Sequence, residues 1–228
     1  MTTTPANLLQ AIELETGPDP IHTVLVMHGL GADGSDFVPI VDELGLPSSS
    51  RIRFVFPHAP RRSVSINRGM VMRAWYDFNV VDASAGFYED SATLQESQRA
   101  IEALIAREGE RAVTPDNIVL AGFSQGGAIA LQTGLRYPKK LAGIMALSCY
   151  VPLLPTLAAE AHSANFSTPI FMAHGRADNV IPITFAAESK RQLLESGYSV
   201  EWHEYPMAHS VSREEIIDIR KWLQRVLP

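Results

Sequence analysis

Short apolar runs recur along the chain, separated by longer stretches in which apolar and polar positions alternate with helical spacing. The lengths of these runs suit β-strands, and most runs are continuous, as expected for parallel strands covered on both faces. The pattern therefore predicts six strands: Thr23 to Met27, Ile52 to Phe56, Ile118 to Ala121, Ala142 to Leu147, Ile170 to Ala173 and Val200 to Tyr205.

The stretches between these runs have amphipathic patterns typical of helices. The predicted helices are Asp36 to Leu44, Ser91 to Glu108, Gly126 to Tyr137, Phe185 to Ser196 and Arg213 to Val226. Because strand and helix alternate along the chain, we expect an α/β fold with a mostly parallel central sheet and helices on both of its faces.

Several predicted helices carry end signals of their own. Pro138 should end the helix before it, because the residue that precedes a proline avoids the helical conformation. Gly197 follows another helix, and Ser212 with Glu215 has the spacing of a capping box before the last one. These signals agree with the boundaries that the apolar pattern predicts.

Two segments depart from this alternation. Residues 57–90 are rich in Arg, Gly and aromatic residues, and residues 150–168 contain the sequence Val-Pro-Leu-Leu-Pro near their start. Long excursions in α/β proteins often build ligand sites at the carboxyl ends of the strands. We therefore expect both segments to lie over the functional site.

The composition fits a large buried sheet. The 228 residues are 46% hydrophobic and only 19% charged, which also argues against disorder. Single α/β domains of this length are common, so one domain over residues 1–228 is expected. A net charge of −6 without a long Lys or Arg run lacks the footprint of a nucleic-acid binder or of a polybasic membrane patch. Nucleic acid is therefore not an expected partner.

The apolar runs and the cysteine content bear on membrane association and on the redox compartment. No apolar run approaches the roughly 18 residues of a transmembrane helix, and the first 20 residues contain no Lys or Arg. Cys149 is the only cysteine, so it cannot form an internal disulfide or a Cys-rich metal site. We expect it to be a small buried hydrophobic residue of a cytoplasmic protein with no integral membrane association.

The sharpest motif is Gly122-Phe123-Ser124-Gln125-Gly126, which follows one predicted strand and opens the next predicted helix. G-x-S-x-G in this context is a nucleophile elbow, a strained turn that exposes the serine oxygen above the sheet. Its glycines keep Cβ atoms out of the crowded turn. Ser124 is the candidate nucleophile, and the alternative is a glycine-rich packing turn in which Ser124 only caps the helix.

A serine nucleophile needs an acid and a base, which follow it along the chain in that order in this architecture. His209 lies in the loop between the last predicted strand and the last helix, and Asp178 lies just past the fifth strand. We therefore predict that Ser124 attacks an acyl carbon, His209 carries the proton and Asp178 orients the imidazole. The alternatives are a solvated loop histidine and an ordinary turn aspartate.

The segment His28 to Gly34 also matches G-x-G-x-x-G between a strand and a helix, which raises a rival prediction of dinucleotide binding. Such a fold wants an acidic residue at the end of the next strand, but Ile52 to Phe56 ends in Pro57-His58-Ala59-Pro60. In a hydrolase the same loop supplies one oxyanion donor, the backbone N–H of Leu30, and Gln125 supplies the other. Neither a metal site nor a cofactor is expected.

Together these motifs resemble the phospholipase/carboxylesterase family of α/β-hydrolases, which includes acyl-protein thioesterases. The matching segments span nearly the whole chain: HGLGADGSDF at 28–37, FPHAP at 56–60, MRAWYDF at 72–78, GFSQGG at 122–127, LSCYVPL at 147–153, HGRADNVIP at 174–182 and the stretch 205–209. Several independent blocks in the right order are far more specific than the serine pentapeptide alone.

The resemblance implies the α/β-hydrolase fold and a cofactor-free serine esterase that acts on a small-molecule acyl ester. It implies Ser124, Asp178 and His209 as the catalytic triad and the amides of Leu30 and Gln125 as the oxyanion hole. It also implies that a homodimer is a frequent assembly.

The candidates for the acyl pocket are Trp75, Val151 and Leu153, with core packing as the alternative for each. The predicted activity is hydrolysis of short to medium acyl esters through an acyl-enzyme intermediate, with thioesters and lysophospholipids as further candidate substrates. The competing class is a non-catalytic ligand-binding protein with the same fold.

Overall fold

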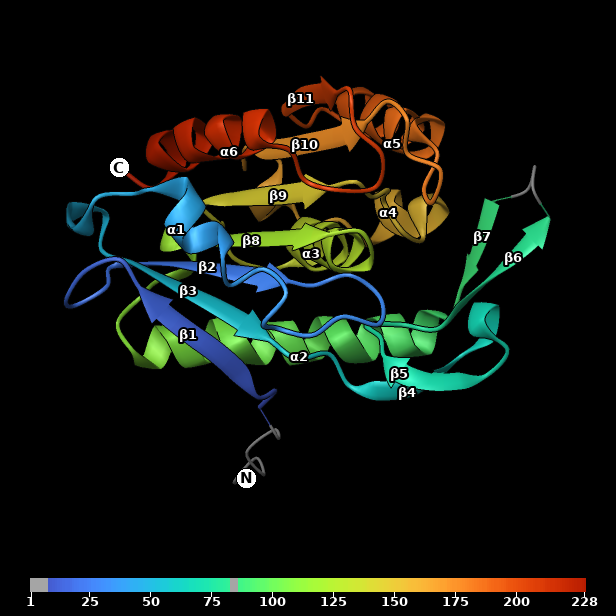
Figure 1. Ribbon diagram of the computed structural model, residues 1–228, viewed down its shortest axis with the longest axis horizontal. Coiled ribbons are helices and arrows are strands. Elements are labelled where there is room, and N and C mark those ends of the chain that lie inside the picture. Colours follow the sequence, from blue (N-terminus) through green and yellow to red (C-terminus); the bar gives the residue numbers. More distant parts are fainter. Residues whose placement is uncertain (1–7, 83–85) are drawn as a thin grey trace.

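A computed structural model describes residues 8–82 and 86–228 of the chain. Its central sheet has the strand order β1-β3-β2-β8-β9-β10-β11. Every neighbouring pair is parallel except β1 with β3, so the expected mostly parallel sheet is confirmed (Figure 1). The strands of this sheet are β1 (Ala11–Glu15), β2 (His22–Met27), β3 (Ile52–Pro57), β8 (Ile118–Phe123), β9 (Gly143–Leu147), β10 (Ile170–Gly175) and β11 (Val200–Tyr205).

Helices cover both faces of the sheet, as expected, and each face has its own hydrophobic core (Figure 1). Buried side chains of α2, α3, α4 and α5 fill one core, and those of α1 and α6 fill the other. None of the helices in the described ranges combines the length and the apolar character needed to cross a membrane. The helices are α1 (Ile40–Leu44), α2 (Ser91–Glu110), α3 (Gln125–Arg136), α4 (Leu154–Glu160), α5 (Ile183–Glu195) and α6 (Arg213–Val226).

The predicted helix ends are found in the structure. Tyr137 leaves the helical conformation directly before Pro138, and Gly197 has a φ of +87° just after α5. The side chain of Ser212 accepts from the backbone N–H of Glu215, and the Glu215 carboxylate accepts from the N–H of Ser212. This reciprocal capping box starts α6 where the sequence places it.

Two elements differ from the predictions. The helix expected from Asp36 begins only at Ile40, because residues 33–39 form a series of tighter turns and Pro39 has no N–H to donate. Strand β1 was not predicted at all. It is a short antiparallel edge strand whose residues are partly exposed, so it lacks the continuous apolar run by which buried strands are recognised.

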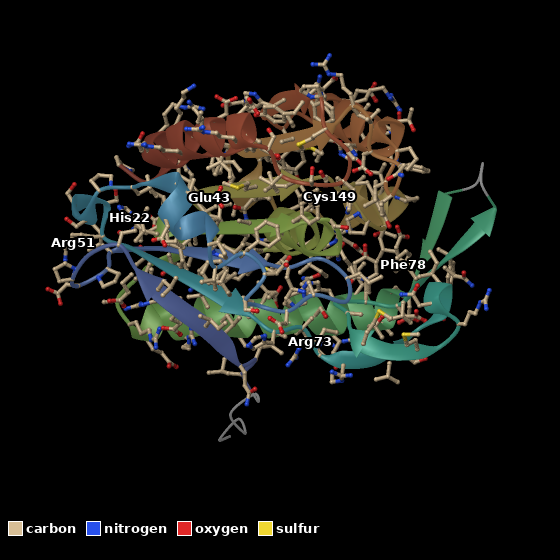
Figure 2. The ribbon with its side chains drawn as sticks, viewed as in Figure 1. His22, Glu43, Arg51, Arg73, Phe78 and Cys149 are labelled. Carbon is tan, nitrogen blue, oxygen red and sulfur yellow. The ribbon has the colours of Figure 1, made fainter. Side chains whose placement is uncertain are left out.

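The two irregular segments contain small elements of their own. Residues 57–90 form two hairpins, β4 (Arg61–Val64) with β5 (Met70–Arg73) and β6 (Phe78–Asp82) with β7 (Gly86–Glu89). Figure 1 shows both hairpins beyond the carboxyl ends of β8 and β9, and Figure 2 labels Phe78 at the base of the β6–β7 hairpin. The segment 150–168 contains α4. Single 3-10 turns complete the fold at Ser48–Ser50, Ser65–Asn67, Pro115–Asn117 and Ser163–Asn165.

Candidate active site

Ser124 occupies a sharp turn between β8 and α3. Its φ of 55° and ψ of −123° lie in a region that residues with a side chain rarely adopt. The turn is held from the neighbouring strand, because the N–H of Ser124 donates to the carbonyl of Leu147 on β9 at 2.8 Å. This is the geometry of a nucleophile elbow, and it explains why the serine hydroxyl stands clear of the sheet.

The glycines around this turn allow α3 to lie directly on the strands. A Cβ on Gly122 would stand 2.3 Å from the carbonyl oxygen of Gly126, and a Cβ on Gly126 would stand 2.1 Å from that of Met27. A Cβ on Gly127 would meet the sulfur of Cys149, which Figure 2 labels near α3, at 2.7 Å. Burial raises the pKa of the Cys149 thiol, so this cysteine is a packed apolar side chain, as expected.

Ser124, His209 and Asp178 are in contact in series. The distance from Ser124 Oγ to His209 Nε2 is 3.0 Å, and that from His209 Nδ1 to Asp178 Oδ2 is 2.7 Å. The other carboxylate oxygen, Asp178 Oδ1, accepts from the backbone N–H groups of Val180 and Ile181, both at 2.9 Å. Because the carboxylate accepts from Nδ1, the neutral imidazole presents Nε2 as an acceptor to the serine hydroxyl.

A second histidine approaches the same carboxylate. His174 is completely buried, and its Nε2 lies 2.8 Å from the carbonyl oxygen of Ile181 and 3.3 Å from Asp178 Oδ2. A carbonyl oxygen can only accept, so Nε2 carries the proton and donates. Burial lowers the pKa of His174, which favours the neutral ring, so this histidine lies beside the acid without adding a charge.

The two residues whose backbone amides are expected to form the oxyanion hole lie at the same cavity. Leu30 and Gln125 both line it, together with Ser124 and His209. Gln125 is the first residue of α3, so its N–H is one of the amides that a helix leaves unpaired at its amino end. A Cβ on Gly29 would stand 3.6 Å from Ser124 Cβ, which places the Leu30 peptide unit beside the nucleophile.

The cavity at Ser124 has a volume of about 410 Å³ and a largely apolar wall. Its floor carries Tyr76 and Tyr150, which are hydrogen-bonded to each other, and Tyr150 is also hydrogen-bonded to Glu89. Burial raises the pKa values of both phenols, so both tyrosines are neutral donors. The apolar residues of the wall are Leu30, Ile66, Phe78, Phe123, Val180 and Ile181.

The three residues expected to form the acyl pocket lie elsewhere. Trp75 is fully buried, and its Nε1 donates to the carbonyl of His28 at 2.8 Å, so it supports the loop that follows β2. Val151 and Leu153 line a separate pocket on the other side of Tyr150. The expectation followed apolar composition alone, which does not tell which way a loop turns once it leaves its strand.

Several side chains of the site have roles that the sequence motifs do not predict. The Gln125 side chain accepts from the N–H of Trp75 at 2.8 Å and donates to the carbonyl of Tyr76 at 2.7 Å, so it fastens the elbow to the segment before β6. Only its position inside G-x-S-x-G could have drawn attention to it. Phe78 and Ile66 belong to the hairpin segment, whose general location over the site was predicted but whose side chains were not.

The parallel sheet, the elbow turn and the strand-end loops define an α/β-hydrolase. A family model for phospholipase/carboxylesterase matches residues 11–227. The chain is 37% identical over 206 residues to acyl-protein thioesterase 1 of Yarrowia lipolytica, which covers 89% of this chain and 90% of that protein. It is 39% identical over 213 residues to acyl-protein thioesterase 1 of Neurospora crassa, with 90% and 87% covered.

A solved structure agrees with these sequence relatives. The crystal structure of Arabidopsis thaliana SOBER1 has a TM-score of 0.84 and 31% sequence identity, over 91% of this chain and 99% of that chain. The chain therefore belongs to the phospholipase/carboxylesterase family, and the resemblance seen in the sequence is confirmed. It is an ester-hydrolysing enzyme with the α/β-hydrolase fold.

Proposed function

We propose that this protein is a serine carboxylesterase that cleaves short to medium acyl esters through an acyl-enzyme intermediate on Ser124. The observation that supports this most directly is the series of contacts from Ser124 through His209 to Asp178, at 3.0 Å and 2.7 Å. These contacts lie at one end of an apolar cavity. A binding protein needs the cavity but not this series of polar groups, so the geometry favours an enzyme.

The chemistry follows from the donors and acceptors. His209 Nε2 takes the hydroxyl proton as Ser124 Oγ attacks the ester carbonyl carbon, and then gives that proton to the departing alcohol. Asp178 stays ionised and stabilises the imidazolium that forms in between. Water then attacks the acyl-enzyme by the same route, which releases the carboxylic acid and restores the serine.

The negative charge that develops on the carbonyl oxygen needs donors that are already in place. The N–H groups of Leu30 and Gln125 supply them in this proposal, because both residues line the cavity beside Ser124. A lost oxyanion donor lowers kcat by about 10² to 10³-fold in related chemistry. The amino end of α3 adds its partial positive charge at the same place.

The acyl chain, in this proposal, lies along the apolar wall that includes Ile66, Phe78 and Val180. These residues replace Trp75 and Val151 as the acyl-pocket candidates. Two of them come from the segment 57–90, so the length of the accepted chain depends on that segment. Val180 is exposed at the rim, where it can cover the chain as it leaves the protein.

A thioester is the second candidate substrate, since relatives in Yarrowia and Neurospora are named acyl-protein thioesterases. The same three side chains cleave either bond, because the attacked atom is an acyl carbon in both. A thiolate leaves more readily than an alkoxide, so a thioester depends less on proton donation by His209. Matched ester and thioester substrates with identical acyl chains therefore separate the two preferences.

The test uses a fluorophosphonate probe together with p-nitrophenyl esters from acetate to palmitate and one matched thioester. We expect an adduct on Ser124, a peak of kcat/KM at short to medium chains, and loss of turnover by several orders of magnitude in Ser124→Ala. The circular dichroism spectrum of that variant should match the wild type. Full activity in Ser124→Ala would refute the nucleophile, and absence of an adduct would favour the non-catalytic binding protein.

The reducing compartment expected from the sequence, the cytoplasm, is proposed on one structural ground. Cys149 is unpaired and buried against Gly127, so the fold neither uses nor offers a disulfide. Fractionation of cells that express the full chain tests this location, and recovery of the protein outside the cytoplasm would contradict it.

A further inference from the structure

His28 is a completely buried histidine at the end of β2 whose two ring nitrogens both have partners. Its Nδ1 lies 2.7 Å from the carbonyl oxygen of Gly29, and its Nε2 lies 3.1 Å from the backbone nitrogen of Ala59. It has no contact with the Ser124, His209 and Asp178 series among the hydrogen bonds of the described residues. Its role must therefore be sought in the peptide unit that it touches.

The partners of His28 fix its tautomer. The Ala59 N–H can only donate, so Nε2 must be unprotonated, whereas the Gly29 carbonyl can only accept, so Nδ1 must carry the hydrogen. Burial lowers the pKa of His28, which keeps the ring in this neutral form. The ring therefore bridges the loop after β3 to the loop after β2.

The hydrogen bond to the Gly29 carbonyl also affects the direction of the Leu30 N–H. The Gly29 carbonyl and the Leu30 N–H belong to one planar peptide unit, in which the C=O and the N–H point in opposite directions. A group that holds the oxygen on one side therefore aims the N–H to the other side. Leu30 lines the cavity at Ser124, and its N–H takes part in no hydrogen bond found among the described residues.

We infer that His28 is the positioning residue of the oxyanion hole: its Nδ1–H holds the Gly29 carbonyl and thereby aims the Leu30 N–H at the oxyanion. This inference rests on the proposed function, because it needs an acyl carbonyl beside Ser124. The inference goes beyond the proposed function because it assigns a role to a residue that touches neither the substrate nor the triad.

Further contacts hold this loop: one to the preceding peptide unit and one to the Gly29 carbonyl itself. Trp75 Nε1 donates to the His28 carbonyl at 2.8 Å, and the two rings lie 5.3 Å apart. The N–H of Ala32 also donates to the Gly29 carbonyl, at the longer distance of 3.3 Å. The turn alone thus gives this carbonyl a weak partner, and His28 supplies the short one.

Two substitutions separate the two bonds of the ring. In His28→Asn the side-chain nitrogen reaches the position of Nδ1 and can still donate to Gly29, while the acceptor for Ala59 is lost. In His28→Gln the amide oxygen reaches the position of Nε2 and can still accept from Ala59, while the donor to Gly29 is lost. Each variant therefore keeps one hydrogen bond and removes the other, so each serves as the other's control.

We expect His28→Gln to lower kcat by about 10²-fold, as for loss of an oxyanion donor, with KM nearly unchanged. His28→Asn should stay within about tenfold of the wild-type kcat, since its donor to Gly29 remains. A boronic acid, which becomes tetrahedral when it bonds to Ser124 Oγ, should lose affinity in His28→Gln but not in His28→Asn, whereas the carboxylic acid product should bind both alike. A purely structural role would instead make activity follow the melting temperature, whichever bond was lost.

A measurement on the unmodified enzyme keeps the inference testable if a variant does not fold. The ¹⁵N shifts of the His28 ring should report a protonated Nδ1 and an unprotonated Nε2. The opposite tautomer, or equal kcat in the two variants, would overturn the inference. Labelling of wild-type Ser124 by the fluorophosphonate is recorded in parallel, because it tests the proposed function and does not depend on His28.

Discussion

Two strands of the central sheet, β2 and β10, lead into the same dipeptide, yet the two corners are built differently. His28-Gly29 follows β2 where the oxyanion hole is proposed, and this place is called the oxyanion corner. His174-Gly175 ends β10 near Asp178, and this place is called the acid corner. Both histidines are completely buried, burial lowers the pKa of both, and each donates to a backbone carbonyl. The shared device is a neutral imidazole that fastens the chain where it leaves the sheet.

The two corners differ in the partner of the second ring nitrogen of each histidine. His28 accepts from the Ala59 N–H, whereas Nδ1 of His174 is buried without a partner among the described residues. His174 Nε2 donates to the Ile181 carbonyl and lies 3.3 Å from Asp178 Oδ2. At the oxyanion corner the imidazole holds only backbone groups, whereas at the acid corner it also lies beside the Asp178 carboxylate.

The largest contrast comes from removing that charge. Asp178→Asn keeps acceptors for Val180 and Ile181 but no longer stabilises an imidazolium or selects the correct His209 tautomer. We expect kcat to fall by about 10⁴-fold, as in serine proteases with the same change, with normal folding. Steady-state kinetics and circular dichroism check this, and a loss of less than tenfold would mean that Asp178 is not the acid.

Replacement by alanine is expected to have different effects on stability at the two glycines of these dipeptides, Gly175 and Gly29. A Cβ on Gly175 would stand 2.4 Å from the carbonyl oxygens of Met207 and Ala208, in the loop that carries His209. That loop has to shift, and a displacement of about 1 Å at a reacting group can lower kcat by 10²-fold. We therefore expect Gly175→Ala to lower both kcat and the melting temperature.

Gly29→Ala is the matched control. A Cβ there would stand 3.5 Å and 3.6 Å from the side chains of Phe123 and Ser124 and 3.8 Å from the Phe123 carbonyl oxygen, all of which is ordinary contact. We expect the melting temperature to stay near that of the wild type, as measured by thermal unfolding of both variants in one buffer. A destabilised Gly29→Ala beside a stable Gly175→Ala would reverse the comparison.

A smaller effect is expected from the imidazole of the acid corner. His174→Leu leaves the Ile181 carbonyl buried without its donor, which should lower the free energy of unfolding by about 1 to 3 kcal/mol. His174→Gln can place an amide N–H near the position of Nε2 and should recover most of that loss. Urea unfolding of the two variants measures the difference, and equal destabilisation would show that the hydrogen bond is not what matters.

The smallest effect on turnover concerns a buried carboxyl outside both corners. Burial raises the pKa of Glu215, at the start of α6, to about 8 from 4.5. The folded protein thus keeps a proton that the unfolded chain loses, so the free energy of unfolding falls as pH rises from about 4.5 to about 8, by at most about 1.4 kcal/mol per pH unit. Glu215→Gln keeps the capping-box acceptor and should remove this slope.

The measurement is urea unfolding at pH 5, 7 and 8.5. The variant should match the wild type most closely at pH 5 and exceed it at pH 8.5. Parallel slopes for the two proteins would mean that Glu215 is ionised in the folded state. Because Glu215 lies outside the cavity, kcat at any one pH should be little changed.

Much of this fold could be predicted because its central strands are buried on both faces and read as continuous apolar runs. The elbow was predictable for a local reason, since the glycines at 122 and 126 are required by backbone atoms within 2.3 Å of the missing Cβ positions. His209 and Asp178 followed from chain order and strand-end position. Strand β1 could not be predicted in this way, because a half-exposed edge strand has no continuous apolar run.

The walls of the cavity were harder to predict for a physical reason. Trp75 and Val151 are apolar and lie in the two segments expected over the site. The directions of their side chains depend on hairpin and loop geometry that hydrophobic periodicity does not encode. His28 stood in a recognised loop, and only the coordinates show that its ring holds Gly29. Contacts made by loops with one another thus mark the limit of what this sequence reveals.

The packing of Gly126 against the carbonyls of Met27 and His28 has a wider meaning. The turn that bears the hydroxyl and the corner that bears the Leu30 amide are wedged together through main-chain atoms, so one cannot drift without the other. Tolerance to new substrates must then be sought at Ile66, Phe78 and Val180. Evolution or a protein engineer can reshape those walls while the reacting geometry is inherited intact.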